Sequence, residues 1–253
     1  TEIYTLSLHD ALPIFLTYVT EEALLDAKIS LPFPAENDLE MIWGSCYGVN
    51  PKHVVDLLQF QGNPEKYQDS PGIQELFQLN FREDSITWPM QDYFGCGISK
   101  IRVGMECCSS ILAISMAASS IRKGKRHIAL AGGFDLFDPL IYFVAHNNGL
   151  IDPELTNPFG QSHKGFNLAD ACGVLVLESE EHARERKLDN CYGEIKGWSL
   201  ACYPSEGSPS IRGICRTIEE SLENASMSIE NIDFISPDRK STRLNSSHVS
   251  PSR

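Results

Sequence analysis

The sequence predicts an α/β fold, because short apolar runs of strand length alternate with longer segments of helical spacing. The clearest apolar runs cover residues 39–43, 127–131 and 174–177. Between two of them lie residues 109–122, which contain no Pro or Gly and have the small and apolar composition of a buried helix. These three observations predict a sheet layered with helices.

The N-terminal elements are a helix and a strand. Residues 20–29 (TEEALLDAKI) predict a surface helix, with Thr20 as the capping residue and apolar residues at helical spacing behind it. Residues 39–43 precede Gly44 and Ser45, which predicts a buried strand that leads into a turn.

A strand, a turn and a helix are predicted around Cys107. Residues 101–105 predict a short strand that runs directly into Cys107. The helix over residues 109–122 has apolar side chains around nearly its whole circumference, so we expect it to be buried on most sides. Lys and Arg residues around Gly124 complement the dipole at its C-terminal end.

The later elements repeat the order of helix and strand. After the strands at residues 127–131 and 174–177, residues 194–202 predict a further strand with weaker alternation. A last helix is predicted at residues 213–225 and a last strand at residues 232–235.

Composition restricts the function classes. With 253 residues, 42% of them hydrophobic, the chain can bury a sizeable core. A net charge of −13 argues against nucleic-acid binding, and no apolar run approaches the roughly 18 residues of a membrane span. The eight cysteines lack the paired spacing of a zinc site and the density of a secreted disulfide scaffold. We therefore expect a cytoplasmic protein without a metal site, in which most cysteines are buried.

Cys107 is the candidate nucleophile. A cysteine where a strand meets the first turn of a helix lies beside unpaired backbone N–H groups and the positive end of the helix dipole, which favour the thiolate. The same N–H groups can stabilise an oxyanion on a thioester carbonyl. A cysteine that is merely packed at this place is the alternative that this reasoning leaves open.

The order of residues around Cys107 resembles the nucleophile region of the β-ketoacyl synthases. That region has the pattern A-C-S/T-S, then a helix of small residues and an apolar strand that ends in A-G-G. Residues 106–110 (ECCSS) and 131–133 (AGG) follow this order. Counting back from the Gly-Gly pair and forward from Phe94 and Gly95 places the nucleophile at Cys107 in both directions. Further landmarks resemble the family at residues 23–29, 44–48, 158–159, 165–166 and 173–178.

The resemblance implies a thiolase-like fold, layered α-β-α-β-α, of which this chain holds the first half and the start of the second. It implies that Cys107 accepts an acyl group from an acyl carrier protein or CoA thioester. A malonyl unit that loses CO₂ then attacks this group, in fatty acid or polyketide biosynthesis. It also implies a homodimer, no cofactor, and two histidines and a lysine that lie beyond Pro237, so that this fragment alone is inactive.

Departures from the family pattern keep two alternatives open. Cys108 stands where the family has Ser or Thr, Glu106 replaces a small residue, and Lys164 stands at a usual Asp position. Residues 169–171 (ADA) replace Gly-Glu-Gly. A carboxylate beside the thiol opposes thiolate formation. One alternative is therefore a non-catalytic partner subunit of the chain-length-factor type, and the other is a thiolase-like enzyme that acts on CoA esters.

Both ends of the chain resemble translated sequencing adapter. Residues 1–14 (TEIYTLSLHDALPI) and 238–248 (DRKSTRLNSSH) each correspond to one reading frame of a common short-read adapter. We therefore expect residues 1–14 and 238–253 to be artefacts and residues 15–237 to be a synthase-like domain truncated at both ends. The family pattern then predicts His-Gly-Thr after Pro237 in the source gene.

Overall fold

The computed structural model describes residues 8–30, 39–45, 93–94, 98–105, 107–135, 137, 139–156, 165–189, 191–201 and 211–236. The chain divides into two compact units. Unit 1 comprises Thr1–Leu140 and Ala169–Leu188, and unit 2 comprises Ile141–Leu168 and Asp189–Arg253. Within the described parts, none of the helices combines the length and the apolar content needed to cross a bilayer.

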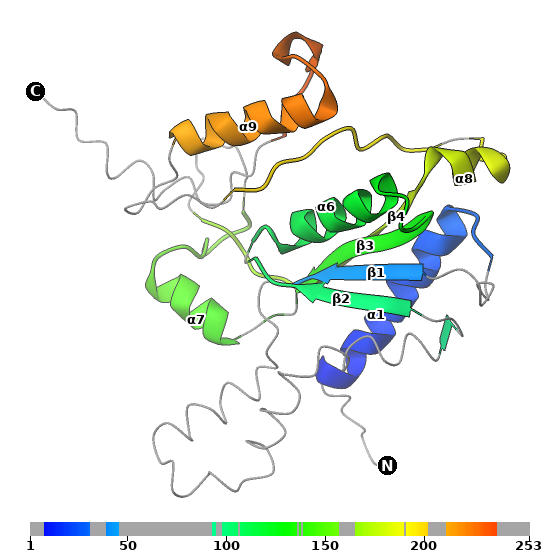
Figure 1. Ribbon diagram of the computed structural model, residues 1–253. Helices are drawn as coiled ribbons and strands as arrows, with labels where there is room; N and C mark the ends of the chain where they lie inside the picture. Colours follow the sequence, from blue (N-terminus) through cyan, green and yellow to red (C-terminus); the bar gives the residue numbers. More distant parts are fainter. Residues whose placement is uncertain are drawn as a thin grey trace, which may run out of the picture. The chain divides into compact units, whose positions relative to one another are not determined.

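Unit 1 is built on a four-stranded mixed sheet with the order β2-β1-β3-β4 (Figure 1). Strands β1 (Leu39–Gly44), β2 (Ile98–Val103) and β3 (Ile128–Asp135) are parallel. Strand β4 (Ala171–Glu178) pairs antiparallel with β3. The chain passes from β2 to β3 through helix α6 (Ser109–Arg122), which crosses over β1. The predicted α/β class is confirmed.

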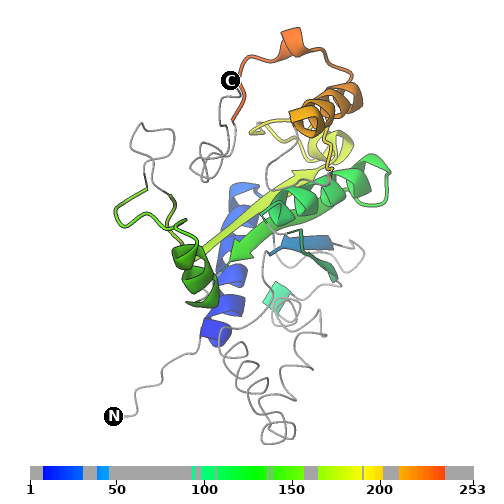
Figure 2. The same ribbon diagram turned by 90° about the vertical axis from the view of Figure 1, so that its left-hand side faces the viewer.

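Two helices cover the two faces of this sheet. Helix α1 (Leu8–Asp26) packs on one face and α6 packs on the other, as Figure 2 shows from the side. The side chains of each strand alternate between the two faces. On β1, for example, Met41 belongs to the cluster on the α1 side, whereas Ile42 belongs to the cluster on the α6 side. The result is a three-layer α-β-α arrangement in unit 1.

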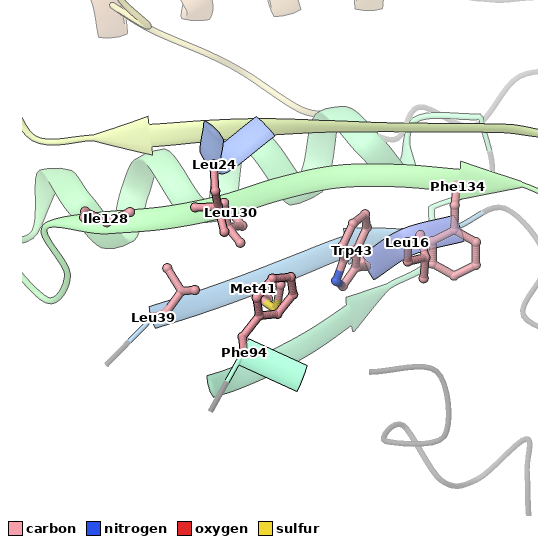
Figure 3. Packing of buried hydrophobic residues seen from close by; sticks show 9 residues of the cluster. All are labelled: Leu16, Leu24, Leu39, Met41, Trp43, Phe94, Ile128, Leu130 and Phe134. Atoms are coloured by element: carbon pink, nitrogen blue, oxygen red, sulfur yellow. The ribbon is translucent and has the colours of Figure 1, made fainter. Parts of the chain in front are cut away.

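The α1 side of the sheet holds the larger side chains (Figure 3). Trp43 and Phe134 meet edge to face, with ring centroids 6.1 Å apart, and Leu16 and Leu24 of α1 are completely buried in the same cluster. On the α6 side, alanines predominate among the fully buried residues. Ala113 and Ala117 pack against Ala129 and Ala131 of β3, so the helix and the strand approach each other closely.

Helix α1 begins earlier than the sequence predicts. It starts at Leu8, so Thr20 lies within the helix rather than at its cap. Leu16, Thr20 and Leu24 are spaced four residues apart and are each 0% exposed, so they form the stripe that packs on the sheet. The capping prediction was wrong because apolar residues continue the helix upstream of Thr20. Residues 8–14 of α1 belong to the terminal segment that resembles an adapter.

The helix prediction for residues 109–122 is confirmed at both ends. Its burial is less complete than predicted, because Ile111 is 56% exposed. The buried positions are Ser109, Ala113, Ser115, Ala117 and Ser120. Strand β2 begins at Ile98, three residues before its predicted start, and ends at Val103. Strand β3 continues through Gly132 and Gly133 to Asp135. The reason is that neighbouring strands supply hydrogen-bond partners along the whole length of β1 and β3.

Two predicted strands are wrong. Within unit 2, helix α9 (Ile211–Ala225) is confirmed, but residues 194–201 form no strand and pack along α9. Ser199 Oγ donates to Glu220 at 2.8 Å, and Asn224 donates to the Trp198 carbonyl at 3.0 Å. Contacts with a helix therefore replace those of a neighbouring strand. Residues 232–235 follow the short 3₁₀ helix η1 (Ile229–Asn231) and are also without strand pairing. Cys202 lies outside the described residues.

Helices α7 (Pro139–Asn147) and α8 (Glu180–Glu185) complete the described elements. Ser179 caps α8 by accepting a hydrogen bond from the His182 N–H at 3.3 Å. Glu178, at the end of β4, accepts two hydrogen bonds from Arg186, at 2.5 and 2.7 Å, and one contact from His182. Burial raises the pKa of Glu178, but the bonds from Arg186 and His182 outweigh it and hold that pKa below its usual value.

We expect Arg186→Met to lower the free energy of unfolding by about 1 to 2 kcal/mol at pH 7. Because the folded-state pKa of Glu178 is lowered, the stability that it contributes is present above its unfolded value of about 4.3 and is lost as the pH falls through the folded value. The difference in the free energy of unfolding between Arg186→Met and wild type should therefore shrink at pH 3. Urea denaturation at the two pH values measures it.

The matched control is Arg184→Met on the same helix. Arg184 pairs with Glu180, and the two side chains are 76% and 86% exposed. Exposed pairs of this kind contribute little to stability. The assignment of the lost stability to the Arg186–Glu178 pair would be contradicted if Arg184→Met lost as much unfolding free energy as Arg186→Met. It would also be contradicted if the loss in Arg186→Met grew on acidification.

Candidate active site

Cys107 lies in a tight turn between β2 and α6. The Cys108 N–H donates to the Met105 carbonyl at 3.0 Å, which closes a four-residue turn with Cys107 in its third position. Leu112 then donates to the Cys108 carbonyl at 2.9 Å, so Cys108 is the N-cap residue of α6. Cys107 is exposed. The predicted placement of this cysteine between a strand and the first turn of a helix is confirmed.

The first turn of α6, which follows Cys107 and Cys108 in the chain, has no side-chain cap. The Cys108 side chain makes no capping hydrogen bond, and no acidic residue stands in the first turn. The first N–H groups of a helix have no partner within the helix and carry its positive dipole end. Cys107 is thus an exposed residue that directly precedes the N-cap of a helix whose first backbone donors are of the kind that can bind the oxygen of a thioester carbonyl.

Two strand-end glycines allow α6 to begin so close to the sheet. A Cβ on Gly44 would lie 2.3 Å from the Ser109 carbonyl carbon and 2.4 Å from the Ser110 nitrogen. A Cβ on Gly133 would lie 2.7 Å from the Ser110 Cβ. All three distances are shorter than Cβ atoms show in real contacts, so only glycine at the end of β1 and near the end of β3 leaves room for the start of α6.

A hydrogen-bonded edge lies at the carboxyl ends of the same strands. The Ser45 N–H donates to the Val103 carbonyl at 3.2 Å, and the Ser45 hydroxyl donates to Asp135 at 3.3 Å. These bonds connect the ends of β1, β2 and β3. In α/β sheets, ligands bind outside the carboxyl ends of the parallel strands. Sequence reasoning named Ser45 only as a turn residue and did not name Asp135, although their positions just after Gly44 and in the strand that follows α6 were the available signal.

The other described cysteines have different environments. Cys172 on β4 is half-buried, and burial raises its pKa to about 11. Cys108, Cys191 and Cys215 are exposed. The expectation that most cysteines are buried is therefore wrong for the described ones, because most lie on loops, at a helix start or on an outer helix face. Cys46, Cys96 and Cys202 lie outside the described residues.

Residues that depart from the family pattern are only partly described. Glu106 and Lys164 lie outside the described residues, and so do the family landmarks Pro158 and Phe159. Asp170 accepts a short hydrogen bond from the Phe137 N–H, which ties the start of β4 to the end of β3. The described residues hold no group of three or more His, Cys, Asp or Glu side chains that could bind a metal ion.

A protein-family model and curated relatives both match this chain. The family model of the beta-ketoacyl synthase N-terminal domain matches residues 10–183. The chain is 31% identical over 184 residues to the polyketide biosynthesis malonyl-ACP decarboxylase PksF of Bacillus subtilis (strain 168), which covers 68% of this chain and 44% of that protein. It is 32% identical over 153 residues to the chloroplastic 3-oxoacyl-(acyl-carrier-protein) synthase II of Arabidopsis thaliana, which covers 55% of this chain and 28% of that protein.

Solved structures share the fold at low identity. The ishigamide ketosynthase/chain length factor superposes with a TM-score of 0.75 at 22% identity and covers 94% of this chain and 60% of its own. The AntDE:AntF complex, a type II polyketide synthase acyl-carrier protein with its ketosynthase, gives a TM-score of 0.69 at 22% identity, with coverage of 96% and 62%. The chain therefore spans less than two thirds of the length of these relatives.

Proposed function

Because the chain belongs to the β-ketoacyl synthase family, we propose that the whole protein is an acyltransferase that forms carbon–carbon bonds, with Cys107 as its acyl-carrying nucleophile. The observation that carries this proposal is the turn that closes between Met105 and Cys108 and leaves Cys107 exposed at the start of α6. The order of landmarks along the sequence also supports it, because the spacing from both directions leads to Cys107.

The proposed reaction has two stages. The Cys107 thiolate attacks the carbonyl carbon of an acyl thioester, and the carrier thiol leaves with a proton. A malonyl thioester then loses CO₂, and the electron pair that remains on its α-carbon attacks the acyl carbonyl carbon. The Cys107 thiolate leaves again, and a 3-oxoacyl thioester remains on the carrier. In both stages an oxyanion forms on the acyl carbonyl, where the N–H groups at the start of α6 would act.

The substrates and partners are part of the proposal. The relatives include an acyl-carrier-protein synthase, a malonyl-ACP decarboxylase and a ketosynthase in complex with its acyl-carrier protein. By analogy, we propose acyl-carrier-protein or CoA thioesters as substrates, in fatty acid or polyketide biosynthesis in the cytoplasm. We also propose that the whole protein is a homodimer. We propose that residues 15–237 are the native part of this chain and that the remaining catalytic groups belong to a part of the protein outside it.

A non-catalytic partner subunit is the second candidate. It is favoured by the similarity to a structure that contains a chain length factor and by the acidic residue Glu106 beside Cys107. The exposed Cys107 at the start of α6 favours the enzyme instead. A thiolase-like enzyme that acts on CoA esters shares this arrangement and differs in the substrate that loads the cysteine.

The experiment uses the protein encoded by the full source gene. Acyl-carrier-protein and CoA thioesters are offered in parallel with the corresponding malonyl thioesters, and mass spectrometry measures covalent acyl loading and 3-oxoacyl product. The enzyme is expected to load an acyl group and to form the product with release of CO₂. A protein that takes no acyl group from either carrier would be the non-catalytic subunit, and product formed from CoA esters alone would indicate the thiolase-like enzyme.

A further inference from the structure

We propose that Ser109 is a positioning residue that holds the Cys107 turn against the sheet. The inference rests on the proposed role of Cys107 and deepens it. Ser109 is the first residue of α6 and is only 3% exposed, although it directly follows two exposed cysteines. Its hydroxyl accepts a hydrogen bond of 2.8 Å from the Met105 N–H, four residues earlier in the chain.

Both backbone polar groups of Met105 are used to close the turn. Its carbonyl accepts from the Cys108 N–H at 3.0 Å, and its N–H donates to the Ser109 hydroxyl at 2.8 Å. The entry to the turn is therefore held by the two residues that follow Cys107. Because Cys107 itself is exposed, its place relative to α6 is set by this backbone more than by packing of its side chain.

The sheet holds the backbone of Ser109 in place. The Ser109 backbone lies against Gly44, where a Cβ would come within 2.3 Å of the Ser109 carbonyl carbon. Because the Ser109 backbone is packed this closely, its hydroxyl cannot shift freely. The hydrogen bond from the Met105 N–H to this hydroxyl therefore holds Met105 in place. Ser109 thus connects the end of β1 to the loop that carries the nucleophile, and a displacement of about 1 Å at a reacting group can cost about a hundredfold in rate.

The test compares two serine-to-alanine changes in the same helix. Ser115 is a matched control, because it is also buried, at 5% exposed, and its hydroxyl donates to the Ile111 carbonyl at 2.7 Å within α6. Acyl loading of Cys107 is measured by mass spectrometry in single-turnover reactions of the full-length protein, at a temperature well below the thermal midpoint of each variant. The rates are recorded at pH 7 and again at pH 9.5.

Ser109→Ala is expected to load about tenfold or more slowly than wild type, whereas Ser115→Ala keeps the wild-type rate. The defect should be the same at both pH values, since it arises from the position of the sulfur and not from the pH of the reaction. Ser109→Thr retains the hydroxyl and is expected to recover most of the rate.

Three results separate the possible failures. Wild-type loading in Ser109→Ala overturns the positioning role and leaves Cys107 as the nucleophile. An equal loss in Ser109→Ala and Ser115→Ala also overturns it, because the effect then belongs to the helix as a whole. Loading that persists in Cys107→Ala instead contradicts the proposed function itself.

Discussion

Cys107→Ala is expected to abolish acyl loading of the full-length protein, whereas Cys108→Ser keeps most of it. Both cysteines are exposed, so accessibility does not distinguish them. The backbone does, because Cys108 donates its N–H to the turn and supplies the first helical carbonyl of α6. Cys107 makes neither of these two hydrogen bonds and is the exposed residue just before the N-cap, so we expect its sulfur to be the one that attacks a thioester. Removing a covalent nucleophile eliminates the acyl-enzyme, so the expected loss is complete rather than partial.

The measurement is mass spectrometry of peptides after incubation with an acyl thioester. Fragmentation of the peptide that contains both cysteines assigns the added acyl mass to one sulfur. Cys172 is an internal control, because burial raises its pKa to about 11 and it should stay unmodified at pH 8. An acyl group on Cys108 with Cys107 unmodified would contradict the assignment.

Gly44→Ala is expected to destabilise unit 1 by about 3 kcal/mol, which is at the upper end of overpacking effects. The new Cβ would lie 2.3 to 2.4 Å from three backbone atoms of Ser109 and Ser110. Backbone atoms of a helix start cannot rotate away as a side chain does, so either α6 or β1 must move. The same movement displaces the turn of Cys107, and acyl loading should fall together with stability.

Gly173→Ala is the matched control for this prediction. Gly173 also lies within a strand of the same sheet, but a Cβ there meets nothing within 4 Å. Urea denaturation should show Gly173→Ala close to wild type and Gly44→Ala far below it. Equal midpoints for the two variants would mean that α6 does not begin as close to β1 as the structure has it.

Local patterns in the sequence determined the elements that carry the candidate site. The helix at residues 109–122 was predictable at both ends, because uninterrupted helix-forming residues are followed by Gly124. The strand at residues 39–43 was predictable from its apolar run and the turn residues after it. The choice of Cys107 followed from the resemblance to the β-ketoacyl synthases, in whose pattern its spacing to Phe94 and Gly133 matches that of the nucleophile.

Only the tertiary structure decided which polar and small residues support that site. Ser109 is one of several serines in its segment, and no local pattern separates it from Ser110. Its role depends on a 2.8 Å bond to Met105 and on its contact with Gly44, which is distant in sequence. The hydrogen bond between Ser45 and Asp135 likewise joins residues 90 positions apart.

Strand formation shows the same division between local pattern and long-range partner. Residues 174–177 are an apolar run, and residues 194–202 alternate weakly between apolar and polar residues, so both segments were predicted as strands. Of the two, residues 174–177 lie beside β3, which provides hydrogen-bond partners along all of β4. Residues 194–201 lie along α9 instead, with Gly197 close to its backbone. A strand is stable only when another strand completes its ladder of backbone hydrogen bonds. The sequence by itself therefore determined the class of fold and the choice of Cys107 as the candidate nucleophile. Long-range pairing decided which runs became strands and which hydroxyl bonds to the turn of Cys107.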